Sequence, residues 1–187
     1  MTALDPETKQ ELRTWLRAQR REIAAARDRA ADDDALAEQV LAVCDQMGLG
    51  AGSTVTLYEA LPVEPPTAAT ARALAARGIR VIVPITLPDL DLDWCVLDDQ
   101  PIEQREALGL RAIGDAQLVL VPGLAVDARH TRLGQGGGCY DRALRRARAD
   151  APRVVLLHPG ELSETPLPLD EHDQPVDGAL TCEGRLL

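Results

Sequence analysis

The chain has 187 residues, a length typical of one domain that can bury a core without disulfide or metal cross-links. Hydrophobic residues make up 45% of it, which excludes wholesale disorder, and the formal net charge of −10 argues against a general nucleic-acid-binding protein, whose surface would be basic. Because aromatic residues make up only 2% and Phe is absent, the core is predicted to be aliphatic.

The sequence gives no sign of membrane insertion or export. It has no apolar run near ~18 residues, and its polar, acidic N-terminal segment lacks the apolar centre of a signal peptide. The four cysteines are far apart and form no CxxC motif, so reduced thiols are expected. We therefore expect a cytoplasmic protein without a membrane or nucleic-acid partner.

Two helices are predicted at the start of the chain. The first covers residues 6–29, with Asp5 as its cap, a proline in its first turn and Glu7 placed to suit the helix dipole. Its apolar stripe consists of Leu12, Trp15, Leu16, Gln19 and Ile23. The second helix covers residues 34–47, and Gly48 ends it.

The next segment predicts a β-loop-α-β unit, in which a crossover helix joins two parallel strands. A β-prone run at 54–58 is followed by a proline-rich loop, a helix at 67–77 and a strand at 79–83 that Pro84 closes. Further strands are predicted at 90–97, 118–121 and 154–157. A glycine-rich loop covers 128–138, the arginines of a helix at 140–148 are interpreted as a solvated face, and the tail from 158 is mostly loop.

Apolar strands that alternate with helices indicate the fold class. We predict a single three-layer α/β/α domain over residues 1–187, with a mostly parallel, Rossmann-like sheet covered on both faces. In such sheets ligands bind beyond the carboxyl ends of the strands.

The strongest chemical signal is a strand that leads into four glycines within five positions, Gly134 to Gly138, and then into a helix. Glycines let backbone N–H groups approach a ligand, and a helix N-terminus favours an anion. Arg132 adds a fixed charge at the mouth of the loop, so a phosphate site is predicted. The sequence matches neither GxxxxGK[ST] nor GxGxxG, and a flexible turn stays open as an alternative.

Single polar residues near these segments have two readings each. Asp141, in the first turn of the helix after the glycines, suits a Mg²⁺ ligand or helix-dipole stabilisation. Glu64, held beside two prolines, could accept hydrogen bonds from a heterocycle or be a solvated loop acid. The segment from His172 to Asp177, which includes Asp173, could supply a metal carboxylate or merely cap a turn. Lys9 is the only lysine in the chain.

Taken together, four segments resemble the 5-formyltetrahydrofolate cyclo-ligase family, and they span nearly the whole chain. The start from Lys9 to Arg13 resembles the family's KxxLR. Its Y…E..T segment is matched by Tyr58, Glu64 and Thr67. Its best-marked motif is matched by the LVPG that begins at Leu120, by Asp127 and by the run from Arg132 to Asp141, and its closing segment by Leu167 to Asp177.

This resemblance implies an ATP-dependent ligase that converts the small molecule 5-formyltetrahydrofolate to 5,10-methenyltetrahydrofolate, ADP and phosphate. The formyl oxygen takes the γ-phosphoryl group of ATP, the N10 amine attacks, and phosphate leaves. The implied cofactors are ATP and Mg²⁺. We expect the chain to act as a monomer or a homodimer.

The resemblance also implies a role for each matched residue. The catalytic residues are Lys9, Arg132 and Tyr140. ATP is held by Lys9, Gln10, Glu11, Leu12, Arg13, Arg132, Leu133, Gly134, Gln135, Gly136, Gly137, Gly138, Cys139 and Tyr140. The substrate is held by Glu59, Glu64, Gln135 and Cys139, and Mg²⁺ by Asp141 and Asp177.

Two loop positions differ from the family, which usually has Tyr or Arg at position 135 and Tyr at position 139, where this chain has Gln135 and Cys139. Both positions are expected to face the ligands. A non-catalytic relative that binds folate or nucleotide therefore stays open. The phosphate-type loop alone also fits an ATP-independent sugar-phosphate or acyl-transfer enzyme on a similar scaffold.

Overall fold

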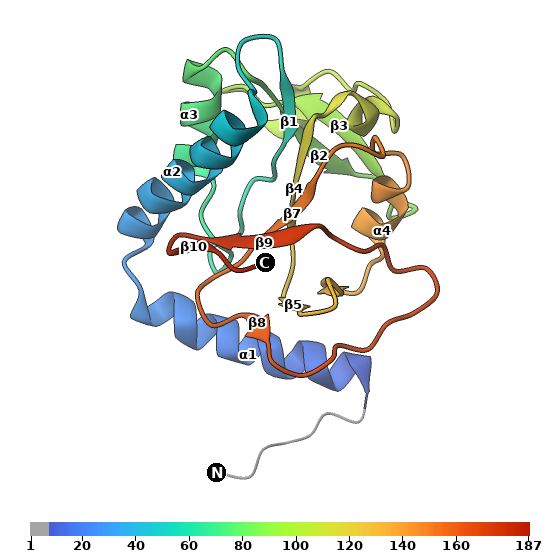
Figure 1. The fold of residues 1–187 in the computed structure, drawn as a ribbon. Helices are drawn as coiled ribbons and strands as arrows, with labels where there is room; N and C mark the ends of the chain where they lie inside the picture. The colour runs from blue at the N-terminus through green and yellow to red at the C-terminus, as the bar shows by residue number, and fades with distance from the viewer. Residues whose placement is uncertain (1–7) are drawn as a thin grey trace.

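A computed structural model describes residues 8–187 of the chain, and its centre is a seven-stranded, mostly parallel sheet (Figure 1). In spatial order the strands are β10 (Gly184–Arg185), β9 (Gly178–Thr181), β7 (Arg153–Leu156), β4 (Leu118–Pro122), β1 (Thr54–Thr56), β2 (Arg80–Thr86) and β3 (Leu92–Val96). The five inner strands are parallel, and the edge strands β10 and β3 are antiparallel to their neighbours.

Helices cover both faces of this sheet (Figure 1). Because side chains alternate along a strand, Leu118 and Leu120 of β4 pack with α2 (Arg29–Met47) and α3 (Ala68–Ala76). Val119 and Val121 pack on the other face with α4 (Cys139–Leu144) and the 3₁₀ turn η2 (Ala112–Asp115). A second 3₁₀ turn, η1 (Ile102–Gln104), lies between β3 and η2 in the chain. The predicted three-layer α/β/α class is confirmed.

The first helix, α1 (Lys9–Ala26), lies below a small second sheet of β6 (Arg132–Leu133), β5 (Ala125–Asp127) and β8 (Leu162–Ser163) (Figure 1). Leu12 and Leu16 of α1 pack against the apolar cluster that Leu133 belongs to. Thr8 caps the helix in a reciprocal capping box with Glu11. The cap, proline and acid predicted at positions 5–7 lie outside the described residues.

A buried ion pair fixes α1 to the main sheet. The Arg20 guanidinium donates Nε to Glu161 Oε1 at 2.6 Å and Nη2 to Glu161 Oε2 at 2.7 Å, and it also bonds the carbonyl of Gly123. Arg20 is 2% exposed, and Glu161 further accepts the backbone N–H of His158. This bidentate geometry holds the helix against the loops that follow β4 and β7.

Several predicted boundaries at the N-terminal half were wrong. The first helix ends at Ala26, and α2 begins at Arg29 because the Asp28 carboxylate caps it by accepting the N–H groups of Ala30 and Ala31. Trp15, predicted in the apolar stripe of the first helix, is 45% exposed.

Other errors concern strands and the last helix. β2 continues through Pro84, because β1 has ended by then and Pro84 pairs only with Trp94 of β3. The basic helix predicted over 140–148 is only six residues long. The tail contributes β9 to the central sheet, although its sequence GALT gives little strand signal.

All four cysteines are free, with Cys44 and Cys95 buried and Cys139 and Cys182 half-buried. Among residues 8–187, no helix has the length and apolar character needed to cross a membrane.

Candidate active site

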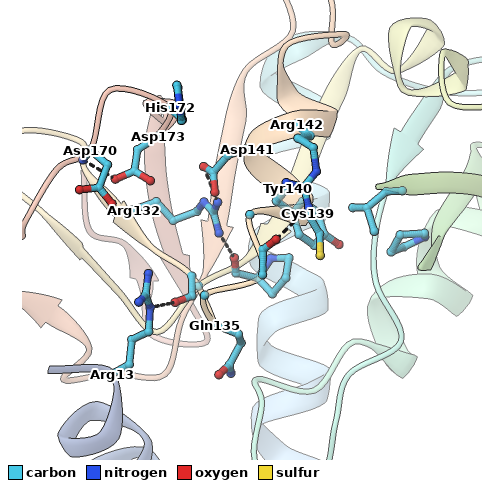
Figure 2. Close-up of a pocket in the computed structure, with 18 of the residues that line it drawn as sticks. Arg13, Arg132, Gln135, Cys139, Tyr140, Asp141, Arg142, Asp170, His172 and Asp173 are labelled. Atoms are coloured by element: carbon cyan, nitrogen blue, oxygen red, sulfur yellow. Dashed lines mark hydrogen bonds and ion pairs between the residues drawn. The ribbon is translucent and has the colours of Figure 1, made fainter. Parts of the chain in front are cut away.

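A cavity of about 600 Å³ lies at the carboxyl ends of β2 and β4, where Pro84, Thr86 and Pro122 line it (Figure 2). Its other walls come from segments far apart in the sequence: α1, the loop before α3, the glycine loop with α4, and the closing segment around Asp173. This is the location at which a parallel α/β sheet is expected to bind a ligand.

Two of the five predicted residues on α1 reach this cavity. Lys9 and Arg13 line it together because residues four positions apart share one face of a helix. Gln10, Glu11 and Leu12 do not line it: Gln10 is exposed, Glu11 belongs to the capping box, and Leu12 packs under the small sheet.

Lys9 lies between two carboxylates of the closing segment. Its Nζ donates to Asp170 at 2.7 Å and to Asp173 at 2.6 Å. Partial burial lowers the pKa of Lys9, but the bonds to the two carboxylates outweigh this effect and leave the pKa raised. Lys9 is therefore a fixed positive charge at neutral pH.

Arg132 provides a second fixed charge in the cavity, where it lies between Asp173 and Asp141 (Figure 2). Its Nη2 donates to Asp141 Oδ1 at 2.8 Å and its Nη1 to the carbonyl of Pro122 (Figure 2). The guanidinium lies 5.9 Å from the centre of the Tyr140 ring. Among residues 8–187, neither the buried Arg132 Nε nor the buried Tyr140 hydroxyl has a hydrogen-bond partner. Burial raises the pKa of that hydroxyl, so Tyr140 is a neutral donor.

The glycines allow the arginines to approach the loop from both sides. A Cβ at Gly134 would lie 2.7 Å from Nη1 of Arg132, and Gly136 has φ +107° beside the Arg13 side chain. Arg13 Nε donates to the carbonyl of Gly134 at 3.1 Å (Figure 2). The backbone therefore passes between two guanidiniums that larger residues would displace.

The positive potential at the loop comes mainly from side chains. With six residues, α4 has too few aligned peptides for the dipole that the sequence suggested. Arg142 and Arg145, interpreted as a solvated face, instead line the cavity, and Arg142 donates to the carbonyl of Gly137 at 2.8 Å. Gln135 and Cys139 also line the cavity, whereas Leu133 is fully buried in the small sheet and does not.

The structure separates the two predicted metal carboxylates. Asp141 lines the cavity, but Asp177 lies outside it and accepts the backbone N–H of Arg153 at 2.8 Å. Asp173 is in the cavity instead, and the N–H of the next residue, Gln174, donates to Asp141 Oδ1 at 3.2 Å. Residue type alone does not distinguish the two acids of the HDQPVD segment, because both suit a metal equally well.

The two carboxylates predicted to bind the substrate also lie apart. Glu64 is 6% exposed, lines the cavity and accepts the N–H of Leu61 through Oε2 at 3.0 Å. Glu59 lines a different cavity of about 830 Å³ beside α3, where it pairs with Arg105 at 2.8 and 3.1 Å. The site at the strand ends therefore contains Glu64 without Glu59.

Comparisons with known proteins agree on one family. The model of the 5-formyltetrahydrofolate cyclo-ligase family matches residues 5–182. A 5-formyltetrahydrofolate cyclo-ligase of Mycolicibacterium smegmatis is 32% identical over 194 aligned residues, covering 95% of each chain. The fold is shared with a 5,10-methenyltetrahydrofolate synthetase from Mycoplasma pneumoniae, with 18% identity, a TM-score of 0.73 and coverage of 91% of this chain and 98% of that one. The fold is also shared with the 5,10-methenyltetrahydrofolate synthetase from Aquifex aeolicus. That comparison has 22% identity and a TM-score of 0.69, and it covers 95% of this chain and 91% of the Aquifex aeolicus chain.

Proposed function

The chain belongs to the 5-formyltetrahydrofolate cyclo-ligase family, a family of ligases, and we propose that it closes 5-formyltetrahydrofolate to 5,10-methenyltetrahydrofolate with ATP and Mg²⁺. The observation that supports this proposal is that Lys9 and Arg13 of α1 line the same cavity as Arg132 and the glycine loop.

ATP fits the cavity because cationic side chains from several segments line it. Within residues 8–187, Arg132 Nε and Arg142 Nε are buried without a hydrogen-bond partner, and a buried donor without an acceptor is destabilising. Lys9, Arg13, Arg132, Arg142 and Arg145 give the cavity five cationic side chains to offset the charge of a triphosphate. Phosphoryl transfer depends mainly on such positioning and charge neutralisation.

For Mg²⁺ we propose Asp141 and Asp173 as the protein ligands, in place of the pair with Asp177. Both carboxylates line the cavity that holds the cationic side chains. No group of three or more His, Cys, Asp or Glu side chains in residues 8–187 could hold a metal alone. A site with two carboxylates suits Mg²⁺, which usually completes its shell with phosphate oxygens and water. When bound, the ion would neutralise charge on the phosphates.

The folate end of the site is proposed at Glu64. Its carboxylate accepts the Leu61 N–H, and the cavity that it lines also has the apolar side chains of Pro84 and Leu92 and the Tyr140 ring. An acceptor in such a place would select the N–H edge of a pterin, since a ligand without donors would leave the carboxylate unsatisfied. The Tyr140 hydroxyl would donate to an acceptor on either ligand.

A turnover assay tests the proposal. Purified protein is mixed with 5-formyltetrahydrofolate, ATP and Mg²⁺, and methenyl absorbance and ADP are followed together. We expect one ADP per methenyl product and a large loss of turnover in Glu64→Ala. Absence of both products would contradict the proposal.

The replacement of an aromatic or cationic residue by Gln135 and Cys139 favours one other candidate, a non-catalytic relative that binds the same ligands. Thermal stabilisation by ATP or 5-formyltetrahydrofolate without turnover would support that candidate, because a ligand stabilises any folded protein that binds it.

A further inference from the structure

One face of α1 carries four cations at positions 9, 13, 17 and 20, and each contacts a different part of the protein. Lys9 contacts the closing segment, Arg13 the carbonyl of Gly134, and Arg20 the buried Glu161. Arg17 is the fourth member. It does not line the cavity, and no part of the proposed mechanism uses it.

Arg17 holds Gln135 by both its side chain and its main chain. Its Nε donates to Gln135 Oε1 at 2.8 Å, and its Nη2 donates to the Gln135 carbonyl at 2.7 Å. The planar guanidinium, with donors in a fixed fork, suits such a two-point contact, which a lysine could not reproduce. The contact links positions 118 residues apart in the chain.

The contact lies beside the glycines, the part of the loop with the greatest backbone freedom. Gly136 and Gly138 both have positive φ, and a run of glycines has many backbone conformations to lose on binding a ligand. Arg13, Arg17 and Arg142 bond the carbonyls of Gly134, Gln135 and Gly137. These bonds also neutralise carbonyl oxygens whose partial charge would repel a phosphate.

We propose that Arg17 is a positioning residue for the glycine loop, Gly134 to Gly138. It acts through Gln135 to hold this loop in its ATP-binding conformation before ATP binds. This inference rests on the proposed function. Preorganisation of this kind strengthens the binding of ATP and has little effect on the rate of the chemical step. Loss of Arg17 therefore raises the KM and Kd for ATP and leaves kcat nearly unchanged.

The test is a set of variants in which ATP Kd, KM and kcat are measured. Arg17→Ala is expected to weaken ATP binding about 5–10-fold, the range for loss of charged hydrogen bonds at a part-exposed site. Gln135→Ala is expected to have a smaller effect, because the main-chain contact remains. The double variant should match Arg17→Ala alone, since both changes break one interaction.

Arg21→Ala is the matched control, because Arg21 is on the same helix, is exposed and forms no hydrogen bond or ion pair with any described residue. It removes the same charge and should change ATP Kd less than about 2-fold. Arg17→Lys should fall between Arg17→Ala and wild type. Equal effects of Arg17→Ala and Arg21→Ala, or full additivity in the double variant, would overturn the proposal.

Hydrogen exchange of the nucleotide-free protein separates this inference from the proposed function. Arg17→Ala should speed exchange at the amides of Gly136–Gly138, and Arg21→Ala should not. Unchanged exchange in Arg17→Ala overturns the positioning role even if ATP binds. A wild-type protein that binds no ATP overturns the proposed function, while faster exchange would still support the contact between Arg17 and the loop.

Discussion

At the scale of residues, two of the five cations of the cavity are already paired with carboxylates of the same protein. Lys9 bonds Asp170 and Asp173, and Arg132 bonds Asp141. A triphosphate that reaches these cations must compete with those carboxylates. In the proposed site, Asp141 and Asp173 would bind Mg²⁺ once ATP has displaced them from the cations. Asp170, whose side chain is 69% exposed, has no such role.

Asp170→Asn is therefore expected to improve ATP binding, because Lys9 loses a competing anion. We predict that the KM for ATP falls about 2–3-fold, in keeping with the small energies of exposed ion pairs. Asp150→Asn is the control, since Asp150 is 70% exposed and pairs with Arg148 away from the cavity. A KM for ATP that rises in Asp170→Asn would show that Asp170 helps to bind the nucleotide.

A pair of substitutions tests the revised metal site. Asp173→Asn is expected to raise the Mg²⁺ concentration needed for half-maximal turnover by about tenfold or more, because it removes one of two carboxylate ligands. Asp177→Asn should stay close to wild type, since Asp177 lies outside the cavity and, among the described residues, its carboxylate accepts a hydrogen bond only from the Arg153 backbone. A larger effect of Asp177→Asn than of Asp173→Asn on the Mg²⁺ requirement would contradict this proposal and support Asp177 as the metal ligand.

The roles of Lys9 and Arg13 were expected from the family resemblance, and residue type alone could not distinguish the two acids of the closing segment. The four-residue interval between Lys9 and Arg13 places both on one side of a helix, and both line the cavity. Nothing in HDQPVD distinguishes Asp173 from Asp177. Their difference depends on how the closing segment turns past α4, which is a tertiary property.

At the scale of elements, one buried carboxylate organises the segments that lead to Arg132. Asp127, 1% exposed at the end of β5, accepts the backbone N–H groups of Arg129, Thr131 and Leu167 at 2.8–2.9 Å. Burial alone would raise the pKa of Asp127, but these bonds outweigh it and the pKa is lowered. The carboxylate thus joins the turn before β6 to the closing segment.

We predict that Asp127→Asn destabilises the protein by about 2–4 kcal/mol, because an amide accepts through one oxygen and leaves buried N–H groups unpaired. Asp34→Asn, at an exposed position on α2, is the control and should change the free energy of unfolding by less than about 0.5 kcal/mol. Urea unfolding measures both. A loss below about 1 kcal/mol in Asp127→Asn would contradict this account.

Asp127 also makes the free energy of unfolding depend on pH. The pKa of Asp127 is lower in the folded protein than its ordinary value of 3.8, so the unfolded chain binds the proton more readily. Its contribution to stability is present above pH 3.8 and is lost as pH falls through the folded pKa. The stability difference between wild type and Asp127→Asn should therefore shrink as pH is lowered below that value.

The elements predicted wrongly are those whose limits depend on neighbours. Pro84 normally ends a strand, but here β1 has already ended and β3 accepts a proline opposite Trp94. The helix α4 stops at Leu144, although the basic pattern continues. The long apolar strands β4 and β7 were predicted to within a residue or two, because their burial on both faces is visible in the sequence.

At the scale of the whole molecule, the site exists because α1 returns to the carboxyl edge of the sheet. Lys9 and Asp173 are 164 positions apart, and no local pattern predicts their contact. The family resemblance suggested that these segments act together, and the fold gives the reason: α1 packs under the small sheet and is fixed by Arg20 to Glu161.

Arg20→Ala is expected to cost about 3–5 kcal/mol, because it leaves Glu161 charged and unpaired in a buried position. ATP affinity should fall as well, since α1 carries Lys9 and Arg13. Arg21→Ala serves again as the control. Thermal unfolding measured with and without ATP checks both effects, and an Arg20→Ala protein as stable as Arg21→Ala would contradict the role of the ion pair.

The most direct test of convergence on one nucleotide is calorimetric titration of ATP and Mg²⁺ into wild type, Lys9→Ala and Arg132→Lys. Lys9 belongs to α1 and Arg132 to the glycine loop, and both line the same cavity. We predict one binding event per chain in the wild type, weakened about tenfold or more by either substitution, because Lys9→Ala removes a charge and Arg132→Lys removes the planar guanidinium donors. ATP binding that is unchanged in either variant would contradict the account.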